Sequence, residues 1–418
     1  MSPALIWLIL ALCLAISVIK YTLAMILKWS APGAEVKKDY SAEPTVSILM
    51  PCYNEGQAVY ETIHSISQSN YPNDKFEVIA QDDCSVDDSY QWMLKAQQDF
   101  SNIRVSVGRN QENSGKARTV CNALQQSKAE IIISIDSDCT FHPDAIRELT
   151  ACFAEPGIGA VGGRVGIRNP NASVLTAIQT LIYYAAFELY KVPENWTRSV
   201  GCISGCLFAI RRELLLEIEP RIRSRHWFGI PVNQGEDRFL THQTLLHGYG
   251  TYINNDAICW TTAPETMGEL FKQQLRWRRS VVRDLFFTLR TLPRHVWTQH
   301  PNTVITLILT PLATILGLLV VVSTLINDPM AWASPLPLVG YLAIAAGLWW
   351  FIRRYSTREA VKNPLAFGAY VAWSFVSSLF ITPLALCTLD SRDWGTRAKA
   401  LPRLEDSHEL DHAEESAS

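Results

Sequence analysis

Four long apolar segments restrict how this chain of 418 residues can fold. Residues 3–27 are interrupted only by Lys20, and residues 302–326, 335–352 and 364–389 contain no charged side chain. Each segment is near or above the roughly 20 residues that an α-helix needs to cross the hydrocarbon core of a lipid bilayer. We therefore expect a multi-pass membrane protein with about four crossings, give or take one.

The composition agrees with a chain divided between lipid and water. Apolar residues make up 48% of it and charged residues only 18%, whereas soluble globular proteins carry about a quarter charged residues. The high apolar content excludes an intrinsically disordered protein. A formal net charge of -3 leaves no basic excess to neutralise phosphates, so we predict no nucleic-acid partner.

Basic residues beside the apolar segments predict how the chain is oriented. None precedes the first segment, whereas Lys28, Lys37 and Lys38 follow it. Because basic residues concentrate on the cytoplasmic side of membrane spans, we expect the long middle region in the cytoplasm and the protein in the plasma (inner) membrane. The first segment is longer than the apolar part of a secretory signal, so it is expected to stay as an anchor.

The same rule gives two answers for the C-terminal tail. Basic residues between 353 and 362 place that loop inside, so a simple fourth span would place the tail outside. The tail nevertheless begins with basic residues, Arg392, Arg397, Lys399 and Arg403, which the rule places inside. Pro383 interrupts the last apolar segment, and a kinked or re-entrant helix there would remove the conflict. The sequence is compatible with either arrangement.

Between about residues 37 and 262, short runs of Val and Ile alternate with amphipathic stretches. This alternation is typical of an α/β domain with a mostly parallel sheet. The expected strands are Val46–Cys52, Phe76–Gln81, Ile103–Val107, Ile131–Ile135, Ile158–Val165 and Cys202–Ile210, and the expected helices are Val59–Ser67, Tyr90–Asp99, Ala117–Gln126 and Asp144–Phe153. In such a sheet, ligands bind beyond the carboxyl ends of the strands.

Acidic residues follow two of the expected strands at that edge. Asp82 and Asp83 come after the second strand, and Asp136 and Asp138 flank a single residue after the fourth. Paired carboxylates suit Mg2+ or Mn2+, which keep coordination positions open for phosphate oxygens. A bare Asp-x-Asp is also common in ordinary loops, but its place after a buried strand and near a second acidic strand end favours a metal site.

Three further polar motifs each have two interpretations. Lys116 precedes a helical pattern and either reaches an anionic ligand or lies on the surface; taken alone, the surface position is favoured. Asp237, in Gly235-Glu236-Asp237, is either a helix N-cap or a catalytic base in a cleft. Gln273-x-x-Arg276-Trp277 fits an amphipathic interfacial helix, although a Trp beside an Arg also suits stacking and phosphate contacts.

In their order along the chain, these motifs resemble those of the membrane-embedded, processive family 2 glycosyltransferases. The closest likeness is to hyaluronan synthases and to nodulation-type chitin-oligosaccharide synthases, and Trp394-Gly395-Thr396-Arg397 after the last apolar segment adds to it. The resemblance covers nearly the whole chain. It implies a GT-A-type α/β fold inserted between transmembrane helices, a UDP-sugar donor, a divalent cation and inversion at the anomeric carbon.

The resemblance also implies a role for each motif residue. Asp237, beside Glu236, would be the catalytic base, and Asp138 together with Asp136 would hold Mg2+ or Mn2+. The UDP-sugar would be UDP-GlcNAc, with UDP-GlcA as a second donor if the product is hyaluronan. Its binding residues would be Asp82, Asp83, Lys116, Asp136, Arg276, Trp394 and Arg397. The growing polysaccharide acceptor would contact Ser204, Gly205, Cys206, Gln273 and Trp277.

Two departures leave the product open. Cys206 stands where hyaluronan synthases usually have Pro, and one apolar segment precedes the α/β domain where they commonly have two. Trp394-Gly395-Thr396-Arg397 leans back toward hyaluronan synthases. The resemblance therefore implies a β-linked polymer that is either hyaluronan or a chitin-like polymer containing GlcNAc.

The sequence thus predicts a processive polysaccharide synthase that also exports its product. The expected divisions are a membrane anchor (1–28), a cytoplasmic GT-A domain (37–262), amphipathic interfacial helices (263–300), a channel-forming transmembrane region (301–390) and a basic, then acidic tail (391–418). One alternative is a polyprenyl-phosphate sugar transferase, which should not need Gln273-x-x-Arg276-Trp277. Another is a membrane transporter with a regulatory α/β domain, which should carry polar or charged residues in its spans.

Overall fold

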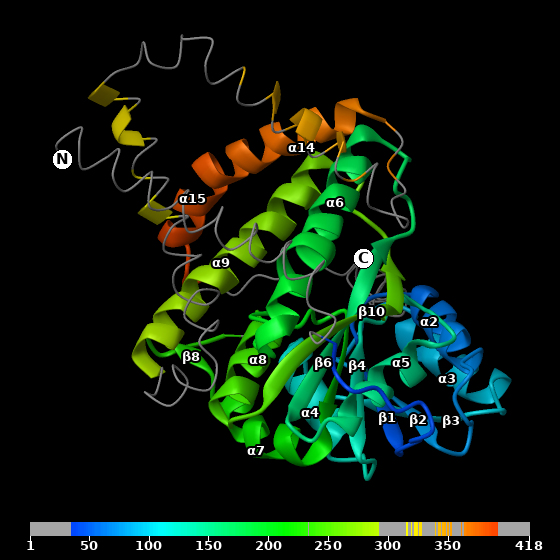
Figure 1. Ribbon diagram of the computed structural model, residues 1–418. Coiled ribbons are helices and arrows are strands. Elements are labelled where there is room, and N and C mark those ends of the chain that lie inside the picture. Colours follow the sequence, from blue (N-terminus) through cyan, green and yellow to red (C-terminus); the bar gives the residue numbers. More distant parts are fainter. Residues whose placement is uncertain are drawn as a thin grey trace, which may run out of the picture.

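The computed structural model shown in Figure 1 describes residues 35–291 apart from 233, single positions and short runs between 315 and 352, residue 361, and residues 363–391. The expected N-terminal anchor, most of the second and third apolar segments, and the tail with Trp394 and Arg397 lie outside the described residues.

A single sheet organises the α/β domain. Its eight strands lie in the order β3-β2-β1-β4-β7-β6-β10-β5. They are β1 (Val46–Cys52), β2 (Phe76–Asp82), β3 (Arg104–Arg109), β4 (Ile131–Ile135), β5 (Thr140–Phe141), β6 (Ile158–Ile167), β7 (Leu207–Arg211) and β10 (Gly250–Thr261). The six expected strands are present, but the expected Cys202–Ile210 begins only at Leu207.

The sheet is mixed, and most of its strands run parallel, as the sequence predicted. Strands β1, β2, β3 and β4 run parallel, as do β6 and β10, but β7 is antiparallel to both of its neighbours, β4 and β6. An antiparallel strand starts at the edge where its neighbours end. The segment between β6 and β7 therefore stays at the carboxyl edge of β4, and the backbone N–H of Asp136 donates to the Cys206 carbonyl at 3.3 Å.

Helices cover both faces of this sheet and give it three layers (Figure 1). Because side chains alternate along a strand, Ile48 and Met50 of β1 pack on one side and Leu49 on the other. The first side holds α2 (Ala58–Ser67), α3 (Ser89–Asp99) and α5 (Ala145–Ala151). The second holds α4 (Lys116–Leu124), α7 (Arg212–Arg223) and α8 (Glu236–Leu246). Burial on both faces explains why β1 and β4 are apolar except for one serine each, Ser47 and Ser134.

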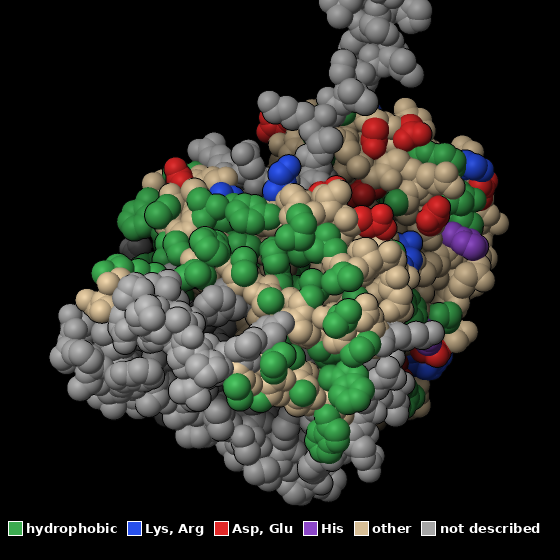
Figure 2. All heavy atoms as spheres, turned by 90° about the horizontal axis from the view of Figure 1, so that it is seen from above, with side chains coloured by type: hydrophobic (Ala, Val, Ile, Leu, Met, Phe, Trp, Pro, Cys, Tyr) green, Lys and Arg blue, Asp and Glu red, His purple; other side chains and the backbone are tan. Residues whose placement is uncertain are grey.

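A further group of helices lies beyond the carboxyl edge of the sheet (Figure 1). It consists of α6 (Val174–Tyr184), α9 (Met267–Thr291), α14 (Leu365–Val376) and α15 (Thr382–Cys387). Ile178 of α6, Leu270 of α9 and Trp373 of α14 meet in one buried cluster. Seen from above, apolar side chains gather on this face (Figure 2). Val174 at the start of α6 and Leu365 at the start of α14 are both exposed.

Among the described residues, Leu365–Cys387 is the one helix with the length and apolar character needed to cross a membrane. It contains α14 and α15, joined by a π-helical turn at Ser377–Ile381. The sequence left open a kinked or re-entrant helix at Pro383. The helix continues through Pro383, which lies in the first turn of α15, directly after the π-helical turn.

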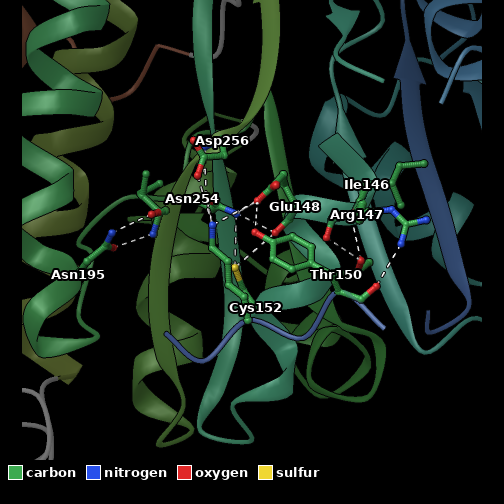
Figure 3. A network of polar contacts seen from close by, with 11 residues as sticks. Ile146, Arg147, Glu148, Thr150, Cys152, Asn195, Asn254 and Asp256 are labelled. Atoms are coloured by element: carbon green, nitrogen blue, oxygen red, sulfur yellow. Dashed lines mark hydrogen bonds and ion pairs between the residues drawn. The ribbon is translucent and has the colours of Figure 1, made fainter. Parts of the chain in front are cut away.

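A buried polar network fixes the bulge of β10 (Figure 3). Lys38 Nζ donates to Glu148 at 3.2 Å and to Asn254 Oδ1 at 3.1 Å. Burial lowers the pKa of Lys38, but the carboxylate of Glu148 outweighs it and holds that pKa above its usual range. Asn195 pairs with the backbone of Ile253 in both directions, at 2.7 and 2.8 Å. The network thus joins the segment before β1 to α5, to β10 and to the segment before β7.

Replacing Asn195 by Ala should destabilise the α/β domain. Asn195 is buried, and its removal leaves the N–H and C=O of Ile253 without partners. We expect the free energy of unfolding to fall by about 2–4 kcal/mol. The measurement is thermal or denaturant unfolding of the purified chain. Asn73→Ala, at an exposed turn residue, is the control and should leave the midpoint unchanged; equal effects of the two changes would contradict this role for Asn195.

Candidate active site

The ends of three strands and the start of a fourth meet at one edge of the sheet. Asp82 ends β2, Asp136 follows β4, and Cys206 precedes β7. Because β1, β2 and β4 are parallel and β7 is antiparallel, all of these positions fall on the same edge. Helices α4 and α8 begin there as well. The topology therefore brings together the motifs that the sequence singled out.

Asp82 and Asp83 both bind neighbouring parts of the chain. Asp82 is fully buried and accepts from Ser85 N at 3.1 Å and from Arg109 Nε at 3.0 Å. Burial raises the pKa of Asp82, and these two donors oppose the rise. Asp83 accepts from the backbone N–H groups of Ser114 and Gly115, both at 2.8 Å. Both carboxylates thus fix loops of the predicted nucleotide site, the second of them directly before α4.

Lys116 is largely buried, with its side chain 14% exposed, and lies between carboxylates. Its Nζ is 2.5 Å from Asp136 Oδ1 and 3.2 Å from Glu236 Oε1, and it donates to the Gly205 carbonyl at 3.2 Å. Burial alone would lower the pKa of Lys116, but the two carboxylates outweigh it and raise the pKa above its usual range. Taken alone, Lys116 was expected on the surface, and this expectation is wrong. The sequence does not show that the start of α8 and the segment before β7 pack against the start of α4.

Asp237 lies in the first turn of α8 and faces the segment before β7. Its Oδ2 is 3.3 Å from Gly205 N and 3.9 Å from Cys202 Sγ, while Oδ1 accepts from Arg238 N at 2.8 Å. A Cβ on Gly205 would be 3.1 Å from Lys116 Nζ and 3.4 Å from the Cβ of Asp237. A side chain there would require Lys116 Nζ to shift by a few tenths of an ångström, so glycine favours the close approach of Lys116 to the predicted acceptor segment Ser204-Gly205-Cys206.

The chain offers one group of possible metal ligands among its described residues, formed by Asp136, Asp138 and Cys139. Their ligand atoms lie within 4.8 Å of one another. The two carboxylates suit a hard divalent cation, and the bound Lys116 leaves Asp136 with a second oxygen. The residues present therefore fit Mg2+ or Mn2+, with Cys139 as a softer neighbour.

The Gln273-x-x-Arg276-Trp277 motif lies on α9, above this edge. Gln273 is buried, and its Oε1 has no hydrogen-bond partner among the described residues. The Trp277 ring meets the Tyr183 ring of α6 edge to face, with centroids 5.9 Å apart. Burial raises the pKa of Tyr183 well above its usual range, with Cys206, Cys139 and Arg276 nearby.

Tyr183 is a site residue that the sequence analysis missed. It lies beside the metal-ligand group and the predicted acceptor segment, yet it belongs to an apolar helical run of the kind that normally packs into a core. A tyrosine in such a run carries no chemical signature of its own. Its only sequence signal is the adjacent Tyr184, which gives the run two phenols in succession.

Comparison with known proteins identifies the chemistry of this edge. The profile of a family described as "Glycosyltransferase like family 2" matches residues 44–280. The chain belongs to this family. The match covers the whole sheet and extends through Trp277, so the motif resemblance inferred from the sequence is confirmed.

Two curated relatives of this family 2 glycosyltransferase cover most of its length. An N-acetylglucosaminyltransferase from Rhizobium sp. (strain N33) is 29% identical over 385 residues, covering 88% of this chain and 81% of the relative. A hyaluronan synthase from Streptococcus pyogenes is 25% identical over 364 residues, covering 85% and 83%. With the family match, these relatives identify the chain as a nucleotide-sugar-dependent hexosyltransferase, which confirms the enzyme prediction over the transporter alternative.

A solved structure supports the fold. The mannosyltransferase PcManGT from Pyrobaculum calidifontis, in complex with GDP-Man and Mn2+, superposes with a TM-score of 0.60 and 20% identity, covering 89% of this chain and 99% of that one. The α/β domain is therefore a GT-A-type glycosyltransferase fold with a mixed sheet.

Gly235, directly before the acidic pair of α8, should not tolerate a side chain. Its φ is +70°, and an added Cβ would lie 2.6 Å from Ser280 Oγ of α9. Gly235→Ala should push α8 away from α9, move Asp237 and reduce kcat by about 10-fold or more.

Gly229→Ala provides a matched control for kinetics on the purified enzyme. Gly229 has a similar φ of +82° but nothing within 4 Å of an added Cβ. Its replacement introduces comparable backbone strain without the contact. If both variants lose the same activity, the contact with Ser280 is not what matters.

Proposed function

We propose that this enzyme is a processive, inverting glycosyltransferase that builds a β-linked polysaccharide from UDP-sugars. The observation that carries the proposal is the contact group of Lys116, Asp136, Glu236 and Asp237 around the backbone of Gly205. In this group, the carboxylate of Asp237 lies beside the predicted acceptor segment. The acidic pair suited to a metal lies on the other side of Lys116. The similarity to an N-acetylglucosaminyltransferase and to a hyaluronan synthase supports GlcNAc as one of the sugars.

Asp237 is assigned as the general base. An acceptor hydroxyl bound next to Gly205 would come within reach of Oδ2, which takes the hydroxyl proton as the oxygen attacks the anomeric carbon. Attack from the face opposite the leaving UDP inverts that carbon. Glu236, on the same helical turn, binds Lys116 and so holds the lysine between the base and the acidic pair.

The other side of the site is assigned to the leaving nucleotide. A divalent cation held by Asp138 and Asp136 would neutralise charge on the diphosphate. Lys116 and Arg276 supply positive charge from the protein, and such preorganised charge favours departure of UDP. Asp82 and Asp83 hold the loops that would enclose the uridine. Trp394 and Arg397 are proposed to complete the nucleotide site from the tail.

The acceptor side is assigned to an aromatic and polar surface. Trp277 and Tyr183 present rings on which a sugar could stack, beside Gln273 and the segment Ser204-Gly205-Cys206. The relatives' names allow two products, hyaluronan or a chitin-like polymer containing GlcNAc. We propose that α9 and the apolar segments adjoin a membrane channel, through which the polymer would leave the cytoplasm as it grows.

Incubation of the purified chain with labelled UDP-GlcNAc, with and without UDP-GlcA, tests this function. We expect polymer to form only with Mg2+ or Mn2+ present, because the acidic pair needs a cation to bind the diphosphate. Hydrolases specific for hyaluronan or for chitin then identify the linkage. Polymer formation that continues in excess chelator would contradict the metal assignment. If neither UDP-GlcNAc alone nor the two UDP-sugars together gave a product, the proposed donor would be contradicted.

Asp237→Asn should abolish transfer while donor binding persists. The amide keeps the size and the hydrogen bond with Arg238 N but cannot take the hydroxyl proton. We expect kcat to fall by about 10²–10⁴-fold with the dissociation constant of UDP nearly unchanged. The measurements are single-turnover transfer and equilibrium UDP binding. Elongation at the normal rate by this variant would show that another group is the base.

A further inference from the structure

One face of α9 carries three buried polar side chains near the start of α8, the helix that contains Asp237. Ser280, Arg283 and Asp284 are spaced so that they lie side by side on the helix surface. Each is less than a tenth exposed, at 5%, 4% and 7%. They lie C-terminal to Trp277, so the motif residues of the proposed function do not account for them.

This face contacts the loop directly before Glu236 and Asp237 in three ways. Gly235 packs against Ser280 so closely that no Cβ fits between them. Arg283 Nη1 is 3.5 Å from Gln234 Oε1. Arg225, just after the end of α7, completes the set, since it donates to the Gln234 carbonyl at 2.8 Å and pairs with Asp284 Oδ1 at 3.3 Å.

The opposite side of Arg283 holds the end of the last apolar helix. Its Nε and Nη2 donate to the Leu389 carbonyl at 3.0 and 2.6 Å, and Nη2 also donates to the Ser391 carbonyl at 3.0 Å. One turn earlier, Arg279 Nε donates to Thr388 Oγ1 at 3.0 Å. Carbonyls after a helix carry partial negative charge and favour a cation there. Arg283 therefore touches both the end of α15 and the loop before the base.

The contacts of Arg283 and Asp284 involve buried charges, so they differ from ordinary apolar packing. Burial lowers the pKa of Arg283 to about 10, helped by Arg225 and Arg279. Burial raises the pKa of Asp284 to about 6, and Arg225 opposes the rise. Apolar residues of similar size would avoid this desolvation cost. What the charged residues add is directional hydrogen bonding, which fixes two backbone segments relative to each other.

We propose that Arg283 is a positioning residue that ties the loop before the catalytic base to the C-terminal end of the last apolar helix. Through Gln234 it fixes the start of α8, and with it the carboxylate of Asp237. Through Leu389 and Ser391 it makes that position depend on where the apolar helix ends. The membrane segment that would adjoin the polymer channel is in this way coupled to the chemistry. The inference rests on the assignment of Asp237 as base.

Kinetics of the full-length enzyme test the link with two single variants and their combination. Arg283→Met keeps the length of the side chain but removes its donors, and Gln234→Leu removes the acceptor on the loop. Each variant should lower kcat, by about 10-fold for Arg283→Met. The reason is that a shift of the Asp237 carboxylate by about an ångström or less is enough to slow the reaction strongly. The KM for UDP-sugar should stay within about twofold, because the nucleotide residues are untouched.

The combined variant should be no slower than the slower single variant, since both changes break the same connection. Arg283→Lys, which keeps a cation at the helix end, should recover part of the lost kcat. Thr388→Val serves as a matched control, because it removes the hydrogen bond of Arg279 to the same helix end without altering Arg283. It should keep kcat within about twofold of the parent.

Three results would overturn the inference. The first is a kcat of Arg283→Met equal to that of the parent enzyme. The second is a combined variant in which the two single losses of kcat multiply. The third is a fall in activity matched by lost UDP binding, which would indicate misfolding. Failure of this inference is distinguishable from failure of the proposed base. If Asp237→Asn abolishes transfer while Arg283→Met leaves kcat unchanged, the base assignment holds and only the coupling fails.

Discussion

The charge balance around Lys116 is the interaction on which the site depends. One buried ammonium contacts Asp136 after β4, Glu236 of α8 and the Gly205 carbonyl before β7. Buried charges are tolerated only when they are paired. Loss of any one partner would leave the others uncompensated, so the three segments must reach the same place in the folded chain. This requirement joins residues that are as far apart in the sequence as Lys116 and Glu236.

The antiparallel direction of β7 makes that convergence possible. A parallel strand in its position would begin at the far edge of the sheet and would place Cys206 away from Asp136. Because β7 runs against β4 and β6, the segment before it ends at the metal-ligand group, and Gly205 enters between Lys116 and Asp237. Because Gly205 has no side chain, Lys116 Nζ approaches it without the shift of a few tenths of an ångström that a Cβ would require.

Much of the fold could be predicted because buried strands have a local signature. β1 and β4 are buried apolar runs with one serine each, and their bounds were predicted to the residue. β10 was missed, since Asn254, Asn255 and Asp256 in its bulge break the strand pattern, and their polar side chains are satisfied only by Lys38 and other distant partners. The direction of β7 was also missed, because direction depends on where the chain has come from rather than on local composition.

The site could be predicted only as a set of separate motifs. Asp136 and Asp237 can be recognised from the sequence, because they are acidic residues at the ends of an expected strand and helix. Nothing in the local sequence indicates that Lys116 contacts Asp136 or that the ring of Tyr183 packs against Trp277. Those relations arise from the packing of α6 and α9 over the sheet edge. Arg283 likewise has no sequence signature, since a basic residue on an amphipathic helix usually faces solvent.

The long excursion between β6 and β7 has a consequence for how this enzyme could change over time. Several residues predicted to hold the nucleotide come from the first strands of the sheet, whereas Tyr183 and Ser204-Gly205-Cys206, on the predicted acceptor side, come from one continuous stretch inserted between two later strands. Part of the predicted acceptor site is thus encoded apart from those donor residues. Exchange of a single cassette of chain, with both of its ends anchored in the same sheet, could alter that part of the acceptor site and leave those donor residues intact.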